Sequence, residues 1–165
     1  MELKELITSV ENFPIKGVLF RDISPLLKSP EALDFISNEF SKKFDLNNVD
    51  YIAGIESRGF ILAMLLAAKT NKGFIPLRKA GKLPPPVVAE SYSLEYGKAT
   101  LEMQKGQGNI VLLDDVLATG GTLVAGINLA EKAGYKVLDV GVLINLTFLN
   151  QLQFNSRKIV SLVEY

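Results

Sequence analysis

The stretch Ile110-Val111-Leu112-Leu113-Asp114-Asp115-Val116-Leu117-Ala118-Thr119-Gly120-Gly121-Thr122 decides the fold of this chain. It opens with four apolar residues, a run too short for an isolated helix and typical of a strand buried on both faces. Two aspartates end that run, a loop of small residues with a Gly-Gly pair follows, and a helical pattern begins after Thr122. This order predicts an α/β protein with an anion pocket where the loop meets the helix.

The loop has the chemistry of a phosphate site. Gly120 and Gly121 let the backbone approach an anion closely, and Thr119 and Thr122 add hydroxyl donors, with Thr122 as the expected N-cap. Charge-assisted hydrogen bonds contribute about 1.5–3 kcal/mol each, so four or five could hold a phosphate without a lysine. The stretch lacks both the Gly-Lys-Ser/Thr of a Walker A loop and the Gly-x-Gly-x-x-Gly dinucleotide turn. An ordinary strand–loop–helix junction is the alternative, but it leaves the adjacent aspartates unexplained.

Composition narrows the class of protein. The chain has 165 residues, which predicts one domain, and its 18 basic and 18 acidic residues give no net charge. That balance argues against a nucleic-acid-binding protein. The chain has no cysteine and no histidine, which excludes thiolate metal sites and leaves any acid–base step to Asp, Glu, Lys or Tyr. No signal peptide and no run of 18 apolar residues is seen, so we expect a cytoplasmic protein without a membrane partner.

Periodicity and punctuation predict the elements along the chain. The expected helices cover 3–10, 30–45, 60–69, 123–133 and 148–154, and the expected strands cover 49–53, 73–78, 87–96, 99–104, 110–113, 136–144 and 159–163. Residues 12–25 are expected to form a loop. Residues 79–102, which contain three consecutive prolines at 84–86, are expected to form an excursion from the main sheet. Strands alternating with helices predict a twisted, mainly parallel sheet flanked by helices on both faces.

A second turn between a strand and a helix, Glu56-Ser57-Arg58-Gly59, is expected at the same sheet edge as the first. Arg58 lies at the positive end of the following helix, where a cation is unfavourable unless something negative compensates it. Asp114 and Asp115 are adjacent at a strand end, so their side chains should diverge. That geometry suits two neighbouring sugar hydroxyls better than a shared-proton pair. The alternatives are a solvated arginine and a solvated acidic turn.

Residues 110–122 closely resemble the 5-phosphoribosyl-1-diphosphate (PRPP) signature of the type I phosphoribosyltransferases. Four further blocks resemble the adenine-specific branch of that family, in the branch's own order across residues 12–148. They are Phe20-Arg21-Asp22, Glu56 to Phe60, Arg78-Lys79 with Gly81-Lys82-Leu83-Pro84, and Ser91 to Gly97. The signature alone would also fit orotate or hypoxanthine-guanine enzymes.

The resemblance implies a single phosphoribosyltransferase domain over residues 1–165, with a small N-terminal hood at about 1–28 and a mobile β-hairpin lid at 79–102. It implies transfer of the 5-phosphoribosyl group from PRPP to adenine, giving AMP and diphosphate in purine salvage. It also implies a homodimer and the use of Mg²⁺, held mainly by diphosphate and ribose oxygens rather than by a protein cage.

The resemblance assigns roles residue by residue. The expected PRPP contacts are Ser57, Arg58, Arg78 and Lys82 for the diphosphate, Asp114 and Asp115 for the ribose hydroxyls, and Ala118, Thr119, Gly120, Gly121 and Thr122 for the 5′-phosphate. The expected adenine contacts are Phe20 by stacking, Leu19 and Arg21 through backbone groups, and Leu146 on the other face. Glu95 is the expected general acid–base, with Arg58 also catalytic and Tyr96 helping to close the lid. A surface charge in a hairpin is the alternative for Glu95.

Two departures from the family pattern stand out. The link between Gln104 and Ile110 is shorter than usual, and the chain ends soon after its last strand, so we expect no C-terminal extension to help form the base site. Two rival functions remain: a phosphoribosyltransferase for another base, and a non-catalytic PRPP-binding regulator on the same fold. The chain carries neither an extra domain nor a basic patch that would favour the regulator.

Overall fold

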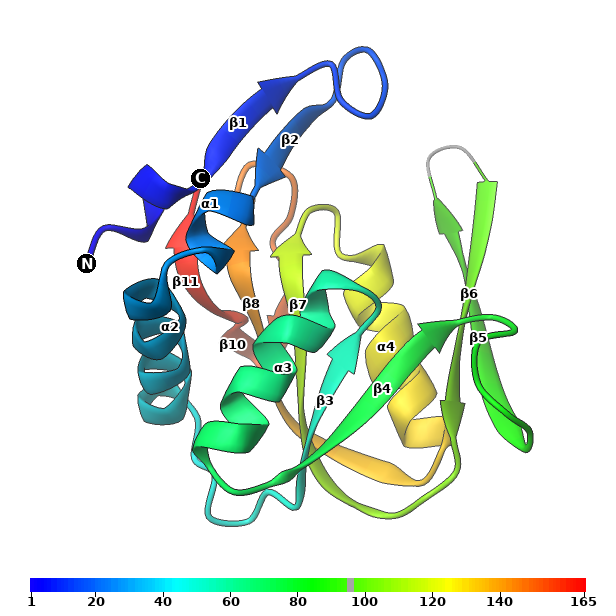
Figure 1. Cartoon of the computed structure of the whole chain (residues 1–165). Coiled ribbons are helices and arrows are strands. Elements are labelled where there is room, and N and C mark those ends of the chain that lie inside the picture. The colour runs from blue at the N-terminus through cyan, green and yellow to red at the C-terminus, as the bar shows by residue number, and fades with distance from the viewer. Residues whose placement is uncertain (95–96) are drawn as a thin grey trace.

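A seven-stranded sheet in the order β11-β8-β7-β3-β4-β6-β5 forms the centre of the protein (Figure 1). The computed structural model describes residues 1–94 and 97–165. Five strands run parallel: β3 (Tyr51–Ile55), β4 (Gly73–Lys79), β7 (Gly108–Leu117), β8 (Tyr135–Asn145) and β11 (Val160–Glu164). The antiparallel hairpin of β5 (Val87–Leu94) and β6 (Gly97–Gln104) extends the sheet beyond β4. The predicted mainly parallel sheet is confirmed.

Helices cover both faces of this sheet, as the alternation of strands and helices predicted (Figure 1). Helices α2 (Pro30–Lys43) and α3 (Arg58–Lys69) pack with Val111 and Leu113 in one apolar core. Helix α4 (Gly121–Lys132) packs with Ile110 and Leu112 in the other core. Because successive side chains of a strand point to opposite faces, β7 contributes to both cores and is buried along its length.

Local signals placed several element boundaries correctly. The Ser29 side chain caps α2 by accepting a hydrogen bond from the Ala32 N–H at 3.1 Å, directly before Pro30. Gly134, with φ of +106°, ends α4 in a left-handed conformation. Strand β4 pairs with β6 only through Arg78 and Lys79. Pro76 therefore lies where β4 has a strand partner on one side only, as its missing N–H predicted.

The expected helix at residues 3–10 is wrong. A 3-10 helix, η1 (Leu3–Leu6), is followed by strand β1 (Thr8–Glu11), which pairs antiparallel with β2 (Leu19–Asp22). A short helix α1 (Ser24–Leu27) then stands where a loop was expected. The helical spacing of the apolar residues has another cause: Leu3 and Ile7 reach the core, whereas Val10 is exposed and lies opposite Phe20 across the ladder. Pairing within the β1–β2 hairpin overrides the local period here.

Two further predictions need correction. Residues 148–154 form no helix: Phe148 is 68% exposed, and β9 (Gln153–Phe154) pairs with β10 (Arg157–Lys158). Residues 79–102 are not wholly separate from the main sheet, because β6 pairs with β4 and buries Leu101 in the core. Among the described residues, no helix is both long and apolar enough to cross a membrane.

Candidate functional site

A hollow of about 210 Å³ lies where β7 passes into α4, and residues 114–123 line it. Gly120 precedes α4 with φ of +99°, a backbone conformation that L side chains rarely adopt. The helix begins at Gly121, so Gly120 occupies the N-cap position and the prediction of Thr122 as N-cap is wrong. The first N–H groups of a helix have no acceptor within it. This end of α4 therefore supplies several donors for an anion, as the sequence predicted for residues 118–122.

Asp114 and Asp115 lie inside β7, which continues to Leu117, rather than at the end of a strand as expected. Both are buried, and the Asp115 N–H donates to Oδ1 of Asp114 at 2.8 Å. Burial, and then the neighbouring charge of Asp115, raise the pKa of the Asp114 carboxyl well above its usual range. The buried Oδ2 of Asp115 has the guanidinium of Arg58 as its neighbour, in an ion pair that lacks the geometry of a hydrogen bond. A carboxylate oxygen has two lone pairs, so this oxygen can also accept from a ligand hydroxyl.

Arg58, the first residue of α3, joins this strand to the N-terminal segment. Its Nε lies 2.5 Å from Oδ2 of Asp115, which supplies the negative partner expected at this helix end. Its Nη1 donates to the carbonyl of Arg21 at 3.2 Å, and its guanidinium lies 4.7 Å from the Phe20 ring centroid. Gly59 makes this approach possible, because a Cβ there would stand 3.0 Å from Oδ1 of Asp114.

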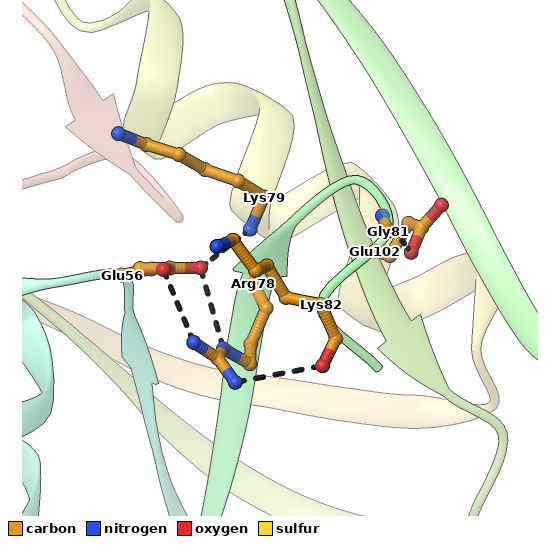
Figure 2. A network of polar contacts seen from close by, with 6 residues as sticks. All are labelled: Glu56, Arg78, Lys79, Gly81, Lys82 and Glu102. Carbon is orange, nitrogen blue, oxygen red and sulfur yellow. Dashed lines mark hydrogen bonds and ion pairs between the residues drawn. The ribbon is translucent and has the colours of Figure 1, made fainter. Parts of the chain in front are cut away.

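The carboxylate of Glu56, in the loop after β3, binds the end of β4 that leads into the hairpin (Figure 2). Glu56 accepts from Nη2 and Nε of Arg78 at 3.2 and 3.3 Å and from the N–H of Lys79 at 2.7 Å. Burial raises the pKa of Glu56, but these hydrogen bonds and the Arg78 charge outweigh it and leave the pKa below its usual value. Arg78 also donates to the carbonyl of Lys82 at 3.5 Å. Arg78 and Lys82 thus come together near the loop that carries Ser57.

The far end of the hairpin approaches the hollow beneath it. The carbonyl oxygen of Ser93 on β5 lies 3.8 Å from where a Cβ of Gly121 would stand. Midway along the hairpin, Lys132 of α4 forms an ion pair with Glu90 of β5. Glu95 and Tyr96, which the sequence singled out, lie outside the described residues.

A second, more apolar hollow of about 390 Å³ adjoins the N-terminal strands. Its lining residues are Val10, Phe13, Phe20, Asp22, Ile23, Ser24, Leu27 and Arg58. Phe13 and Phe20 meet edge to face with centroids 5.1 Å apart. Leu19 is 45% exposed on the same strand. Leu146 does not line this hollow; it is buried after β8, and its N–H donates to the carbonyl of Leu117 at 2.9 Å.

One residue that the sequence did not single out connects these parts. The Nδ2 of Asn150 donates to the carbonyls of Ala118 and Leu146 at 2.9 and 3.0 Å, and to Oδ1 of Asn145 at 3.1 Å. Its Oδ1 accepts from the N–H of Leu152, which fixes the orientation of the amide. Asn150 was missed from the sequence because a helix was expected at 148–154. An asparagine side chain that bonds to the backbone two residues ahead is typical of a turn.

Comparison with known proteins covers nearly the whole chain. The phosphoribosyl transferase domain model matches residues 23–160. The adenine phosphoribosyltransferase of Bdellovibrio bacteriovorus is 59% identical over 165 residues, 100% of both chains. The adenine phosphoribosyltransferase of Nitrosopumilus maritimus is 51% identical over 170 aligned residues, again covering 100% of both.

Solved structures agree with these relatives. The crystal structure of adenine phosphoribosyltransferase from Rhodothermus marinus superimposes with a TM-score of 0.89 at 40% identity, covering 99% of this chain and 96% of that one. The enzyme from Giardia lamblia, solved with 9-deazaadenine, gives a TM-score of 0.88 at 35% identity, with 99% and 96% covered.

Proposed function

This chain belongs to the phosphoribosyl transferase family, and we infer that it transfers the 5-phosphoribosyl group from PRPP to adenine, giving AMP and diphosphate. The observation that carries this function is the junction between the two hollows. Arg58 lines the apolar hollow and pairs with Asp115, which lines the hollow at the start of α4. A flat apolar base and a sugar phosphate bound in these hollows would meet at Arg58.

PRPP binding follows from the hollow at the start of α4. We propose that residues 118–122 hold the 5′-phosphate and that Asp114 and Asp115 accept from the two ribose hydroxyls. When the bond from C1 to the diphosphate oxygen breaks, positive charge develops on the ribose, and the two buried carboxyls are proposed to stabilise it. Ser57, Arg58, Arg78 and Lys82 are the proposed contacts of the departing diphosphate.

Adenine is proposed to stack on Phe20, with backbone groups of Leu19 and Arg21 at its amino edge and Leu146 on its other face. As a ring nitrogen of adenine bonds to C1, its proton must leave, and we propose that Glu95 accepts it. Closure of the hairpin over residues 79–102, with Tyr96, would exclude water, which otherwise traps the ribosyl cation and hydrolyses PRPP. The approach of Ser93 to Gly121 supports this direction of closure.

Magnesium is proposed as the cofactor, in keeping with the family. Among the described residues, no three acidic, histidine or cysteine side chains gather to hold a metal ion. This fits an ion held mainly by diphosphate and ribose oxygens, the usual habit of Mg²⁺ with phosphorylated substrates. When bound, the ion neutralises charge on the diphosphate leaving group. A cytoplasmic homodimer acting in purine salvage completes the proposal, and sedimentation velocity measures the subunit number.

The proposed function predicts that the purified chain forms AMP from adenine and PRPP when Mg²⁺ is added, measured by chromatography of the products. Parallel assays with hypoxanthine, guanine and orotate test the base. If hypoxanthine is used at least as efficiently as adenine, the rival function, a phosphoribosyltransferase for another base, is correct. If PRPP binds without any turnover, the chain is a regulator instead.

Asn150→Ala is predicted to lower kcat/KM for PRPP about tenfold, because the amide that donates to the carbonyl of Ala118 and holds it to Asn145 and Leu146 is removed. Steady-state kinetics measure the change. Gln151→Ala is the matched control, because Gln151 is the exposed neighbour of Asn150 and makes none of these contacts. An unaltered kcat/KM in Asn150→Ala would show that the loop keeps its shape without this amide.

A further inference from the structure

We propose that Tyr165 is a positioning residue of the base site, holding both chain segments to which the proposed function assigns adenine contacts. The inference rests on the proposed function and deepens it at the adenine subsite. Neither the sequence patterns nor the resemblance assigned Tyr165 a role, and the expectation that nothing after the last strand helps form the base site left it out. Its ring contacts the β2 segment, and its main chain contacts the segment that carries Leu146.

The ring of Tyr165 fixes the side chain of Arg21. The guanidinium carbon of Arg21 lies 3.8 Å from the ring centroid, within the range of a cation–π contact. On β1, the hydroxyl of Ser9 accepts a hydrogen bond from Nη1 of Arg21. The carbonyl of Arg21 accepts from Arg58 at 3.2 Å. The side chain and the carbonyl of Arg21 are therefore both anchored, and the ring of Tyr165 is one of the anchors.

The main chain of Tyr165 fixes the opposite segment. Its oxygen accepts from the N–H and the Oγ1 of Thr147 at 2.9 and 2.8 Å, and its N–H donates to the carbonyl of Asn145 at 3.0 Å. Both chain neighbours of Leu146 are thus bonded to Tyr165. Because the Leu146 N–H is itself bonded to Leu117, the segment is held from two sides.

These contacts predict that loss of the Tyr165 ring affects the two substrates differently. Arg21 reads adenine through its backbone in the proposed site, so an unanchored Arg21 side chain weakens the base contacts. The hollow proposed for the 5′-phosphate is lined by residues 114–123, whereas the cations over the ring of Tyr165 are Lys4 and Arg21 of the N-terminal segment. Losing the ring should therefore raise KM for adenine and leave KM for PRPP almost unchanged.

The experiment compares three variants of the full chain by steady-state kinetics with adenine and PRPP. Tyr165→Leu removes the ring but keeps the main-chain hydrogen bonds, and we expect its KM for adenine to rise about fivefold. Tyr165→Phe keeps the ring and should restore the wild-type value. Lys4→Met removes the other cation, 4.9 Å from the ring, without touching Arg21, and should also match the wild type.

A purely structural role would raise both KM values together and lower the melting temperature. That result in Tyr165→Leu would overturn the inference, as would a KM for adenine within twofold of the wild type or an equal defect in Tyr165→Phe. The wild-type chain distinguishes failure of the proposed function from failure of the role of Tyr165. If it forms no AMP, the proposed function fails; if it forms AMP and Tyr165→Leu is unaffected, only the role of Tyr165 fails.

Discussion

Arg58→Met is expected to lower kcat/KM for both adenine and PRPP by about a thousandfold. The methionine keeps much of the side chain's bulk but removes the partner of Asp115, the donor to Arg21 and the cation above Phe20. Leaving a buried carboxylate such as Asp115 without its cation typically costs about 3–5 kcal/mol, and about 4 kcal/mol corresponds to a thousandfold. Steady-state kinetics with each substrate varied in turn measure the loss.

Arg58→Lys is the informative control. A lysine keeps the charge but presents a compact ammonium, which cannot pair with Asp115 and donate to Arg21 in the fixed geometry of a guanidinium. We expect it to recover only part of the activity. Full activity in Arg58→Lys would show that charge alone matters. If Arg58→Met lowered kcat/KM for PRPP but not for adenine, Arg58 would act on the diphosphate and not on the base.

Asp114→Asn is expected to raise the free energy of unfolding at neutral pH while lowering kcat/KM for PRPP by about a hundredfold. Burial and the charge of Asp115 raise the pKa of Asp114, so an ionised Asp114 is unfavourable in the folded chain. Asparagine keeps an oxygen that can accept from the Asp115 N–H and removes the charge. The same charge is proposed to assist the ribose, and losing a charged hydrogen bond costs about 1.5–3 kcal/mol.

The pH dependence of this stabilisation has a definite sign. Because the folded pKa is raised, folded protein binds more protons than unfolded protein above the unfolded pKa, and stability falls as pH rises toward the folded pKa. Below the unfolded pKa the wild type and Asp114→Asn should be equally stable, and the gap should open as pH rises. Urea denaturation at several pH values measures it. A variant less stable than the wild type at neutral pH would contradict the raised pKa.

The parts of the fold that the sequence predicted are those governed by neighbouring residues. Four apolar residues ahead of Asp114 indicated a central strand, and Ser29-Pro30 indicated a helix start. The mistaken segments are those whose conformation is set by strand pairing and not by the period of their apolar residues. Val10 belongs to a helical pattern but pairs with Phe20, and at 148–154 Phe148 is exposed while Gln153 and Phe154 pair with β10.

The site shows the same division. The motif around Gly120 and Gly121 predicted the hollow, and the helix-end argument predicted that Arg58 needs a negative partner. Which group supplies that partner depends on how β7 meets α3, and one-dimensional spacing does not contain this relation. The amide of Asn150 was missed for the same reason, since its acceptors belong to two other segments of the chain.

The pairing of β4 with β6 is short, consisting of Arg78, Lys79 and a bond from the N–H of Ala80 to the carbonyl of Thr100, and this has a mechanical consequence. The carboxylate of Glu56 holds both Arg78 and Lys79 from the side of the parallel strands (Figure 2). Rotation of the β5–β6 hairpin about this pairing would break few backbone hydrogen bonds, and its main cost would be moving Leu101 and Met103 within the core. The five parallel strands, with the loop of residues 118–122 that is proposed to bind phosphate at their edge, would keep their alignment throughout such a rotation.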